Sequence, residues 1–238
     1  MAVIAILNNR PGQASGTGST ATPVPAGSAA NVAVTAPGSP LPDGITRDGR
    51  TLGSATAKVT LDVWEDFQCP ACANFTNQIE PVLINRYVVP GQLKITFHDF
   101  AFLGQESQDA ASAARCAGQQ GKFWEFHDYL YANQNGENQG WFTRDRFIAI
   151  ADKIGLDQAA FAACYDGGSQ RQAVTAETQS GSTVGVGSTP TLILDGRTLS
   201  LSSYTSWDDF LGDIDRTIIA AGGSIAPSSP TPAASPSS

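Results

Sequence analysis

The motif Cys69-Pro70-Ala71-Cys72 constrains the fold most, because it follows an apolar segment, Val59–Trp64, and precedes a segment with helical patterning. A cysteine at the start of a helix lies beside unpaired backbone N–H groups and the positive end of the helix dipole. Both lower the pKa of its thiol below the usual value of about 8.5. Cys69 has this position, and Cys72 lies within covalent reach, able to attack a mixed disulfide formed at Cys69. The motif therefore predicts a redox-active pair.

Two other interpretations of the motif are weaker. A structural zinc site needs four ligands, but Cys116 and Cys164 form no second close pair. The histidines, His98 and His127, do not have the spacing of zinc ligands either. A purely structural bridge within the motif would close so small a ring that it removes little entropy from the unfolded chain. We expect neither a metal nor a cofactor.

The two ends of the chain differ in composition from its middle. From Asn8 to about Arg50 the sequence is mainly Gly, Ser, Ala, Thr and Pro, which predicts a flexible linker. Residues 223–238 have a similar composition, and we expect them to be disordered because they cannot offset their ordering entropy by burial. The predicted folded domain spans residues 51–222.

The first residues, Met1–Leu7, are apolar but far fewer than the roughly 20 needed to cross a bilayer. They have no basic segment and no cleavage site. We interpret residues 1–50 as the remnant of a membrane anchor followed by a linker, the alternative being an ordinary hydrophobic N-terminus. The four cysteines, in one close and one distant pair, also favour an oxidising compartment. We therefore expect an extracytoplasmic protein of the bacterial cell envelope, membrane-tethered or secreted.

The net charge of the chain is −8 at pH 7, with acidic residues spread through the middle of the sequence. Binding to nucleic acid requires a basic surface that replaces the counterions of the phosphates, and no basic stripe is present. We expect no nucleic-acid partner. The acidity itself is typical of a soluble surface.

Hydrophobic periodicity predicts alternating strands and helices, and hence the α/β class. The first β-α-β unit comprises a strand over 61–64, a helix over 71–87 bent or broken at Pro81, and a strand over 93–97. A short strand or turn over 52–57 precedes it. Helices separated by glycine-rich breaks follow over 108–117, 123–131, 143–154, 157–165 and up to about Val184. A hairpin of strands 191–194 and 198–201 around Asp195-Gly196 and an amphipathic helix from Trp207 complete the domain.

This order resembles the thioredoxin-like fold with the inserted helical domain of DsbA-like thiol:disulfide oxidoreductases. The segments that carry the resemblance are Asp66–Cys72, Gly121–Asp128 and Ser188–Thr191, and they occur in the family's order. The resemblance places the helical insertion at about residues 105–185. It implies that Cys69 is the nucleophile and that Cys72 is the resolving cysteine.

The same resemblance implies that Pro190 is in the cis form and lies beside the two cysteines. An ordinary trans proline in a loop is the alternative. A cis proline before a strand would leave the backbone of Thr189 free to pair with a substrate chain. Together with Pro70 and Ala71, Thr189 is therefore expected to contact substrate.

Two departures from the family pattern bear on the chemistry. Many relatives carry a buried glutamate six residues before the first active-site cysteine, where it exchanges a proton with the resolving thiol, but here that residue is Val63. Asp62 and Glu65 flank it; strand alternation directs Asp62 to the opposite face, and neither is an assured substitute. The Pro-Ala dipeptide lacks the histidine of the strongest oxidants in the family, which predicts a less oxidising pair.

The remaining cysteines, Cys116 and Cys164, are predicted to form a structural bridge. Any pairing other than 69 with 72 and 116 with 164 would consume the reactive motif. Both lie in predicted helices next to small side chains, which allow the close approach that a disulfide requires. Two buried free thiols are the alternative.

Three classes of function fit these features. The first is an extracytoplasmic oxidase that acts on reduced, unfolded secreted polypeptides. The resemblance implies that a membrane quinone-linked partner of the DsbB or VKOR type reoxidises it. The second is a reductase or isomerase that uses the same cysteines, and the third is a non-catalytic, chaperone-like peptide-binding module. We expect the domain to act as a monomer.

Overall fold

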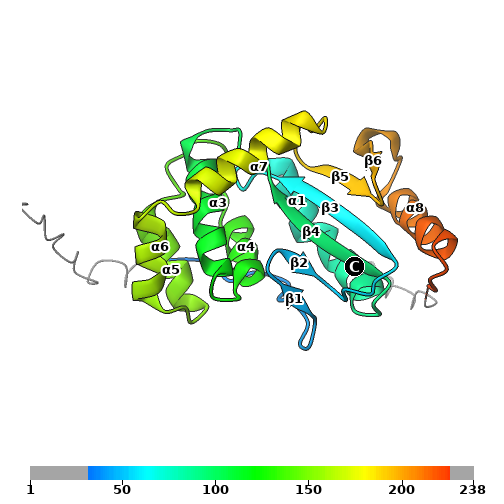
Figure 1. The fold of residues 1–238 in the computed structure, drawn as a ribbon, viewed down its shortest axis with the longest axis horizontal. Helices are drawn as coiled ribbons and strands as arrows, with labels where there is room; N and C mark the ends of the chain where they lie inside the picture. The colour runs from blue at the N-terminus through cyan, green and yellow to red at the C-terminus, as the bar shows by residue number, and fades with distance from the viewer. Residues whose placement is uncertain (1–31, 226–238) are drawn as a thin grey trace, which may run out of the picture.

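The computed structural model describes residues 32–225 (Figure 1). The predicted anchor remnant at residues 1–7 and the tail from residue 226 onward lie outside this range. Within residues 32–225, none of the helices combines the length and the apolar character needed to cross a membrane.

The N-terminal limit of the folded part requires a correction for residues 32–50, which were expected to be linker. Val34, Leu41 and Ile45 are partly buried against the hydrophobic core. The backbone N–H of Thr35 donates to Oδ1 of Asn133 at 2.6 Å. Scattered apolar side chains in a Pro- and Ser-rich segment thus suffice to attach it, because each one covers an exposed part of the core.

A mixed six-stranded sheet forms the centre of the molecule, in the order β1-β2-β4-β3-β5-β6. Only β3 and β4 are parallel to each other, and all other neighbouring pairs are antiparallel. The strands are β1 (Arg47–Asp48), β2 (Thr51–Leu52), β3 (Val59–Glu65), β4 (Leu93–Asp99), β5 (Thr191–Leu194) and β6 (Arg197–Leu199). The central β3 carries the active-site motif directly after its C-terminal end.

Helices cover the sheet and form a separate group at one end of it (Figure 1). The helices outside the insertion are α1 (Pro70–Gln78), α2 (Glu80–Leu83), the π-helical turn η2 (Ile84–Val88), the 3-10 turn η3 (Leu201–Ser203) and α8 (Trp207–Ala220). The inserted helices are α3 (Gln105–Gly118), α4 (Phe123–Ala132), α5 (Arg144–Lys153), α6 (Gln158–Asp166) and α7 (Arg171–Thr183). Their positions confirm the predicted helical insertion and the α/β, DsbA-like fold.

Helix α7 covers the face of the sheet opposite to the main core. Trp64 of β3 packs there with Phe100 and Val186. A Cβ atom at Gly181 would lie 2.8 Å from ring atoms of both Trp64 and Phe100. Only glycine therefore lets α7 lie this close to the sheet.

The predicted elements agree with the structure apart from small shifts at their ends. Asp195 and Gly196 both have positive φ values, 45° and 80°, as the predicted tight hairpin turn requires. The second hairpin strand begins one residue earlier than expected, at Arg197. It also ends earlier, at Leu199, because Leu201–Ser203 forms a 3-10 turn instead of strand. The helix after the motif is interrupted at Ile79, and Pro81 lies in the first turn of the next helix. Backbone N–H groups in a first turn have no partner within the helix, so the N–H that proline lacks costs no hydrogen bond there.

A network of ion pairs joins the β4 strand to α3 and α7. Nε2 of His98 lies 3.1 Å from Oδ1 of Asp62, and its Nδ1 lies 3.1 Å from Oε1 of Glu177. The other ion pairs of the network join Arg50 and Arg115 to Asp99 and Glu177. His98 is thus a structural residue near a strand end, and it stacks on Trp64 with ring centroids 4.4 Å apart.

This network predicts a stability that falls in mild alkali. Burial opposes protonation of His98, but the carboxylates of Asp62 and Glu177 raise its pKa to about 9. Since the folded-state pKa exceeds the unfolded value of about 6.5, the stabilisation is complete below pH ~6.5 and is lost as the pH rises through about 9. We expect His98→Gln to lower the melting temperature at pH 6 and to have little effect at pH 10. An equal effect at both pH values in thermal unfolding would contradict this origin.

Candidate active site

The two motif cysteines occupy different environments at the start of α1. Cys69 is the N-cap residue, and Pro70 follows it in the first helical turn. The backbone N–H of Cys69 donates to the carbonyl of Asp66 at 2.9 Å. Cys69 retains 7% exposure, whereas Cys72 is fully buried. Pro70 and Ala71 are exposed above them. Of the two cysteines, only Cys69 therefore has any exposed surface.

The pKa values of the two thiols are shifted in opposite directions. Hydrogen bonds to the Cys69 sulfur lower the pKa of this thiol to about 6. The hydrogen bond with the Cys72 side chain contributes most and outweighs the opposing effect of burial. The Thr189 side chain and the backbone N–H groups of Cys72 and Ala71 lower the pKa further. Burial raises the pKa of Cys72 well above its usual value, and the contact with Cys69 and the charge of Glu65 raise it further. At neutral pH Cys69 is a thiolate and Cys72 a thiol.

The buried carboxylate of Asp66 holds the turn before the motif in place. Its Oδ1 accepts from the Gln68 N–H at 2.8 Å and from the Ser107 hydroxyl at 2.6 Å. Its Oδ2 accepts from the N–H groups of Phe102 and Leu103 at 2.9 and 3.1 Å. One side chain thereby ties the β3–α1 turn to the segment between β4 and α3, and so positions Cys69.

Two residues from the helical insertion also support the turn. Nε2 of Gln134 donates to the carbonyls of Phe67 and Cys69 at 2.7 and 2.9 Å. The N–H of Asn138 donates to Oε1 of Gln68 at 2.6 Å. Sequence analysis did not identify Gln134 or Asn138, because each acts across more than 60 residues and no local pattern marks it. The insertion is therefore part of the active-site scaffold.

The loop before β5 brings Thr189 and Pro190 next to Cys69. The Thr189–Pro190 peptide bond is cis, as the family resemblance implied. Sγ of Cys69 lies 3.3 Å from the Thr189 carbonyl oxygen, to which the protonated thiol donates. Both loop residues remain partly exposed beside the sulfur. Residues 120 positions apart in the sequence thus form one site.

Glu65 is a buried carboxylate behind the motif, and its charge raises the pKa of Cys72. Strand alternation places Glu65 on the same face as Val63, and it is only 1% exposed. The hydroxyl of Tyr131 donates to its Oε2 at 3.1 Å. Burial raises the pKa of Glu65, although the neighbouring His127 and Tyr131 lower it. Asp62 lies on the other face with His98, as expected.

A comparison with protein families matches the thioredoxin model to residues 46–213. The chain belongs to the thioredoxin family. The match begins before residue 51 and includes β1, β2 and the whole helical insertion.

Relatives within the thioredoxin family support the DsbA-like assignment. A probable disulfide bond formation protein D of Bacillus cereus is 33% identical over 103 residues, which are 42% of this chain and 48% of the relative. The chain thus spans about half the length of the curated relatives that it matches.

Solved structures show the same fold. The oxidised BdbD of Bacillus subtilis has a TM-score of 0.66 at 22% identity, over 71% of this chain and 92% of that one. The DsbA of Chlamydia trachomatis has a TM-score of 0.62 at 19% identity, over 72% and 90% of the two chains.

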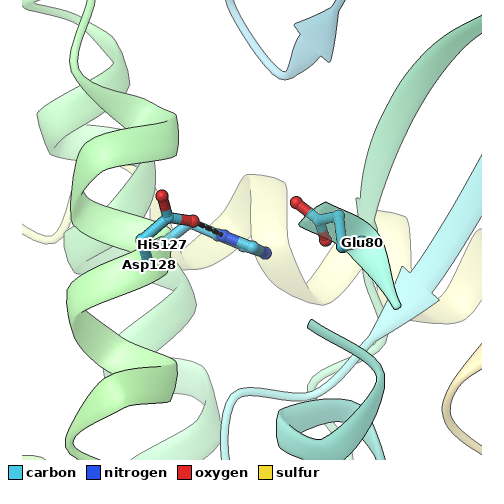
Figure 2. Close-up of side chains that lie close together, drawn as sticks. All are labelled: Glu80, His127 and Asp128. Carbon is cyan, nitrogen blue, oxygen red and sulfur yellow. Dashed lines mark hydrogen bonds and ion pairs between the residues drawn. The ribbon is translucent and has the colours of Figure 1, made fainter. Parts of the chain in front are cut away.

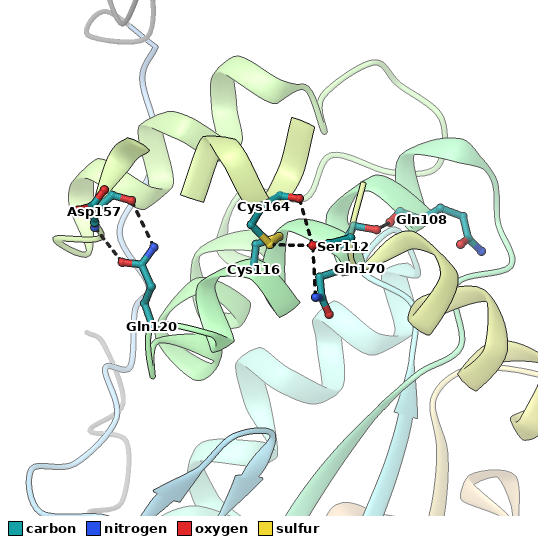
Figure 3. The surroundings of a disulfide bond; sticks show 8 residues. Gln108, Ser112, Cys116, Gln120, Asp157, Cys164 and Gln170 are labelled. Atoms are coloured by element: carbon teal, nitrogen blue, oxygen red, sulfur yellow. Dashed lines mark hydrogen bonds between the residues drawn. A yellow bond between two sulfur atoms is a disulfide. The ribbon is translucent and has the colours of Figure 1, made fainter. Parts of the chain in front are cut away.

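The second cysteine pair of this thioredoxin-family domain joins two inserted helices (Figure 3). A disulfide links Cys116 of α3 to Cys164 of α6, with Cα atoms 5.8 Å apart and the two positions 48 apart in the sequence. The hydroxyl of Ser169 lies 3.4 Å from the Cys164 sulfur. Cys69 and Cys72 are free thiols. Because Cys116 and Cys164 are bonded to each other, they cannot complete a zinc site with the motif.

Proposed function

We propose that this chain is an extracytoplasmic thiol:disulfide oxidoreductase that forms disulfides in reduced, unfolded secreted polypeptides. The observation that carries the proposal is the contrast between the two thiols. Cys69 keeps some exposed surface and its pKa is lowered to about 6, whereas Cys72 is fully buried and its pKa is raised. This contrast separates an attacking or leaving sulfur from a protected resolving sulfur.

The reaction begins with the Cys69–Cys72 disulfide. A substrate thiolate attacks Sγ of Cys69, the disulfide breaks, and Cys72 leaves as a thiolate that takes up one proton. A second substrate thiolate then attacks the substrate sulfur of the mixed disulfide and releases Cys69 as a thiolate. The substrate loses two electrons and the motif gains them. A low pKa makes Cys69 a good leaving group, which favours this direction.

The surface around Cys69 supports binding of an extended polypeptide. Pro70 and Ala71 are exposed on one side of the sulfur, and Thr189 and Pro190 are partly exposed on the other. The backbone of Thr189, directly before β5, is placed to pair with a substrate strand. Backbone pairing recognises an unfolded chain without regard to its sequence, as an oxidase with many clients requires.

Reoxidation of the motif requires an external oxidant. By family resemblance we propose a membrane quinone-linked partner of the DsbB or VKOR type, which accepts two electrons from the reduced motif. A tether formed by the residues before residue 32 would keep the domain near such a partner. Reduction by a membrane electron donor would instead give a reductase or isomerase.

The equilibrium redox potential of the motif against glutathione tests the direction of the reaction. The pKa of Cys69, about 6, lies between the values of about 7 for thioredoxin and 3.5 for DsbA. We therefore expect a potential between about −270 mV and −120 mV, the values of those two proteins. We also expect oxidised protein to form disulfides in a reduced two-cysteine peptide.

Two results would favour the other classes of function. A potential at or below that of thioredoxin would indicate a reductase. Peptide binding that is unchanged in Cys69→Ser, with no oxidation by the unmodified protein, would indicate a binding module.

A further inference from the structure

A cluster of buried ionisable side chains lies behind the active-site cysteines. His127 of α4 is fully buried, and Glu80 of α2 is 3% exposed. Nδ1 of His127 lies 2.9 Å from Oδ1 of Asp128, and Figure 2 shows the imidazole between Asp128 and Glu80. One ring nitrogen of His127 and one carboxylate oxygen from each of Glu80 and Asp128 all lie within 4.8 Å of one another. The cluster brings several acidic groups around one imidazole with almost no access to water.

The inner end of this cluster reaches the active site through Glu65. Nε2 of His127 lies 3.7 Å from Oε2 of Glu65, which also accepts a hydrogen bond from Tyr131. The charge of Glu65 in turn raises the pKa of Cys72. Oε1 of Glu65 and Nε2 of His127 are buried and have no hydrogen-bond partner among residues 32–225. Both atoms are therefore free to hold or exchange a proton.

The outer end of the cluster opens into a cavity on the surface. The cavity has a volume of about 190 Å³ and is bordered by Glu80 and Asp128, by Thr76 and Asn77 of α1, and by residues 37–42. This volume is enough for several water molecules, since each occupies about 30 Å³ in the liquid. Pro70, Ala71, Thr189 and Pro190, which form the proposed substrate-binding surface, do not border this cavity. The cavity therefore gives water a separate approach to the cluster.

We propose that Glu65, His127 and Glu80 form a proton route between the buried Cys72 thiol and water in this cavity. The inference rests on the proposed function, because only a cysteine that cycles between thiol and disulfide must gain and lose a proton. It also gives a chemical role to the buried His127.

Each step of the route moves one proton. When the Cys69–Cys72 bond opens, the Cys72 thiolate takes a proton from the carboxylic acid of Glu65. The imidazolium of His127 reprotonates Glu65, and His127 recovers a proton from Glu80 or from water. When Cys72 attacks a mixed disulfide, the same steps run in reverse. The exchange partner supplies or accepts the electrons, so the route needs no further reactant.

In the cluster, the pKa values of both Glu80 and His127 are raised. Burial raises the pKa of Glu80 to about 8, so it holds a proton at neutral pH. Burial opposes the charge on His127, but Asp128 and Glu65 raise its pKa to about 10. The other groups that face the cluster are Tyr131 and Glu125 of α4 and Arg47 of β1.

The two-step reaction of the reduced full-length protein with Ellman's reagent tests the route. Cys69 attacks the reagent first and releases one nitrothiobenzoate. Cys72 then loses its proton, attacks the Cys69 sulfur and releases the second. The second phase therefore reports deprotonation of Cys72. We expect Glu80→Gln and His127→Gln to slow this phase by about tenfold or more at pH 7 and to leave the first phase unchanged, a size typical of lost general-base assistance.

The pH profile separates proton transfer from a structural effect. In the two variants the second phase should accelerate steeply between pH 7 and 9, because hydroxide replaces the lost route, whereas the unmodified protein should change little. Glu125→Gln is the matched control, because it removes a carboxylate from the same helix outside the route. Added imidazole should accelerate the second phase of His127→Ala and not that of Glu125→Gln.

A variant at the cavity mouth tests the outer end without altering the buried cluster. Asn77→Phe should obstruct the cavity and slow the second phase, whereas Gln78→Phe, on the neighbouring exposed position of α1, should not. Unchanged second phases in both Glu80→Gln and Asn77→Phe would overturn the proposal. A zinc-dependent rise in melting temperature that Glu80→Gln abolishes would also overturn it, since a bound cation would displace the proton. Failure of the unmodified protein to oxidise peptides, with both phases intact, would refute only the proposed function.

Discussion

In the reduced protein, Cys69 is expected to react with iodoacetamide at least ~100-fold faster than Cys72 at pH 7, because only thiolates react. With a pKa of about 6, Cys69 is almost fully ionised at this pH. Cys72 has a raised pKa and no exposed surface, so its thiolate is both scarce and inaccessible. A brief pulse followed by fragment mass spectrometry of the peptide that carries both cysteines gives the ratio, and the pH profile of labelling should have its midpoint near the pKa of Cys69.

The same experiment tests the cause of the lowered pKa. The hydrogen bond with Cys72 contributes most to the lowering. Cys72→Ala should therefore move the midpoint of Cys69 labelling to higher pH, whereas Cys72→Ser, which keeps a donor, should move it less. Preferential labelling of Cys72 would reverse the two roles. A midpoint of Cys69 labelling that stays at the value of the unmodified protein in both variants would exclude Cys72 as the cause.

Replacement of both Cys116 and Cys164 by Ala is expected to have the largest effect on stability. The bridge spans 48 residues, and closing a loop of this length contributes about 4 kcal/mol in the chain-entropy model. For a chain of this size that loss lowers the melting temperature by roughly 10 °C. The disulfide lies between α3 and α6, away from the motif, so the rate of exchange at Cys69 should stay nearly constant. Thermal unfolding and peptide oxidation below the melting temperature measure the two effects.

The matched control replaces Cys69 and Cys72 together by Ala. Their ring is so small that its loss should hardly change the melting temperature of the oxidised protein, while peptide oxidation is abolished. If the variant without Cys116 and Cys164 instead lost exchange and kept its stability, the second pair would act as a redox relay. The reaction would then need two redox centres.

The sequence determined those features that short-range rules govern. A cysteine before Pro70 at a strand-to-helix junction is exposed to the helix N-terminus whatever the rest of the chain does, so the reactive thiol was predictable. Periodicity of apolar residues predicted the strands and helices for the same reason. Elimination among four cysteines predicted the bridge between Cys116 and Cys164, which the structure contains. The alternation of β3 correctly directed Asp62 away from the core, and applied to Glu65 it would also have identified the buried carboxylate.

Tertiary structure alone decided which distant groups surround the motif. The contacts of Asp66 with Ser107, of Gln134 with Cys69 and of Thr189 with Cys69 join segments 41, 65 and 120 residues apart. Packing of the whole domain sets these distances, and no local pattern encodes them. The attachment of residues 32–50 depends likewise on a core surface that exists only after folding. The surroundings of His127 have the same origin, because helices α2 and α4 and strand β3 must pack together before their carboxyl groups can meet one imidazole inside the domain.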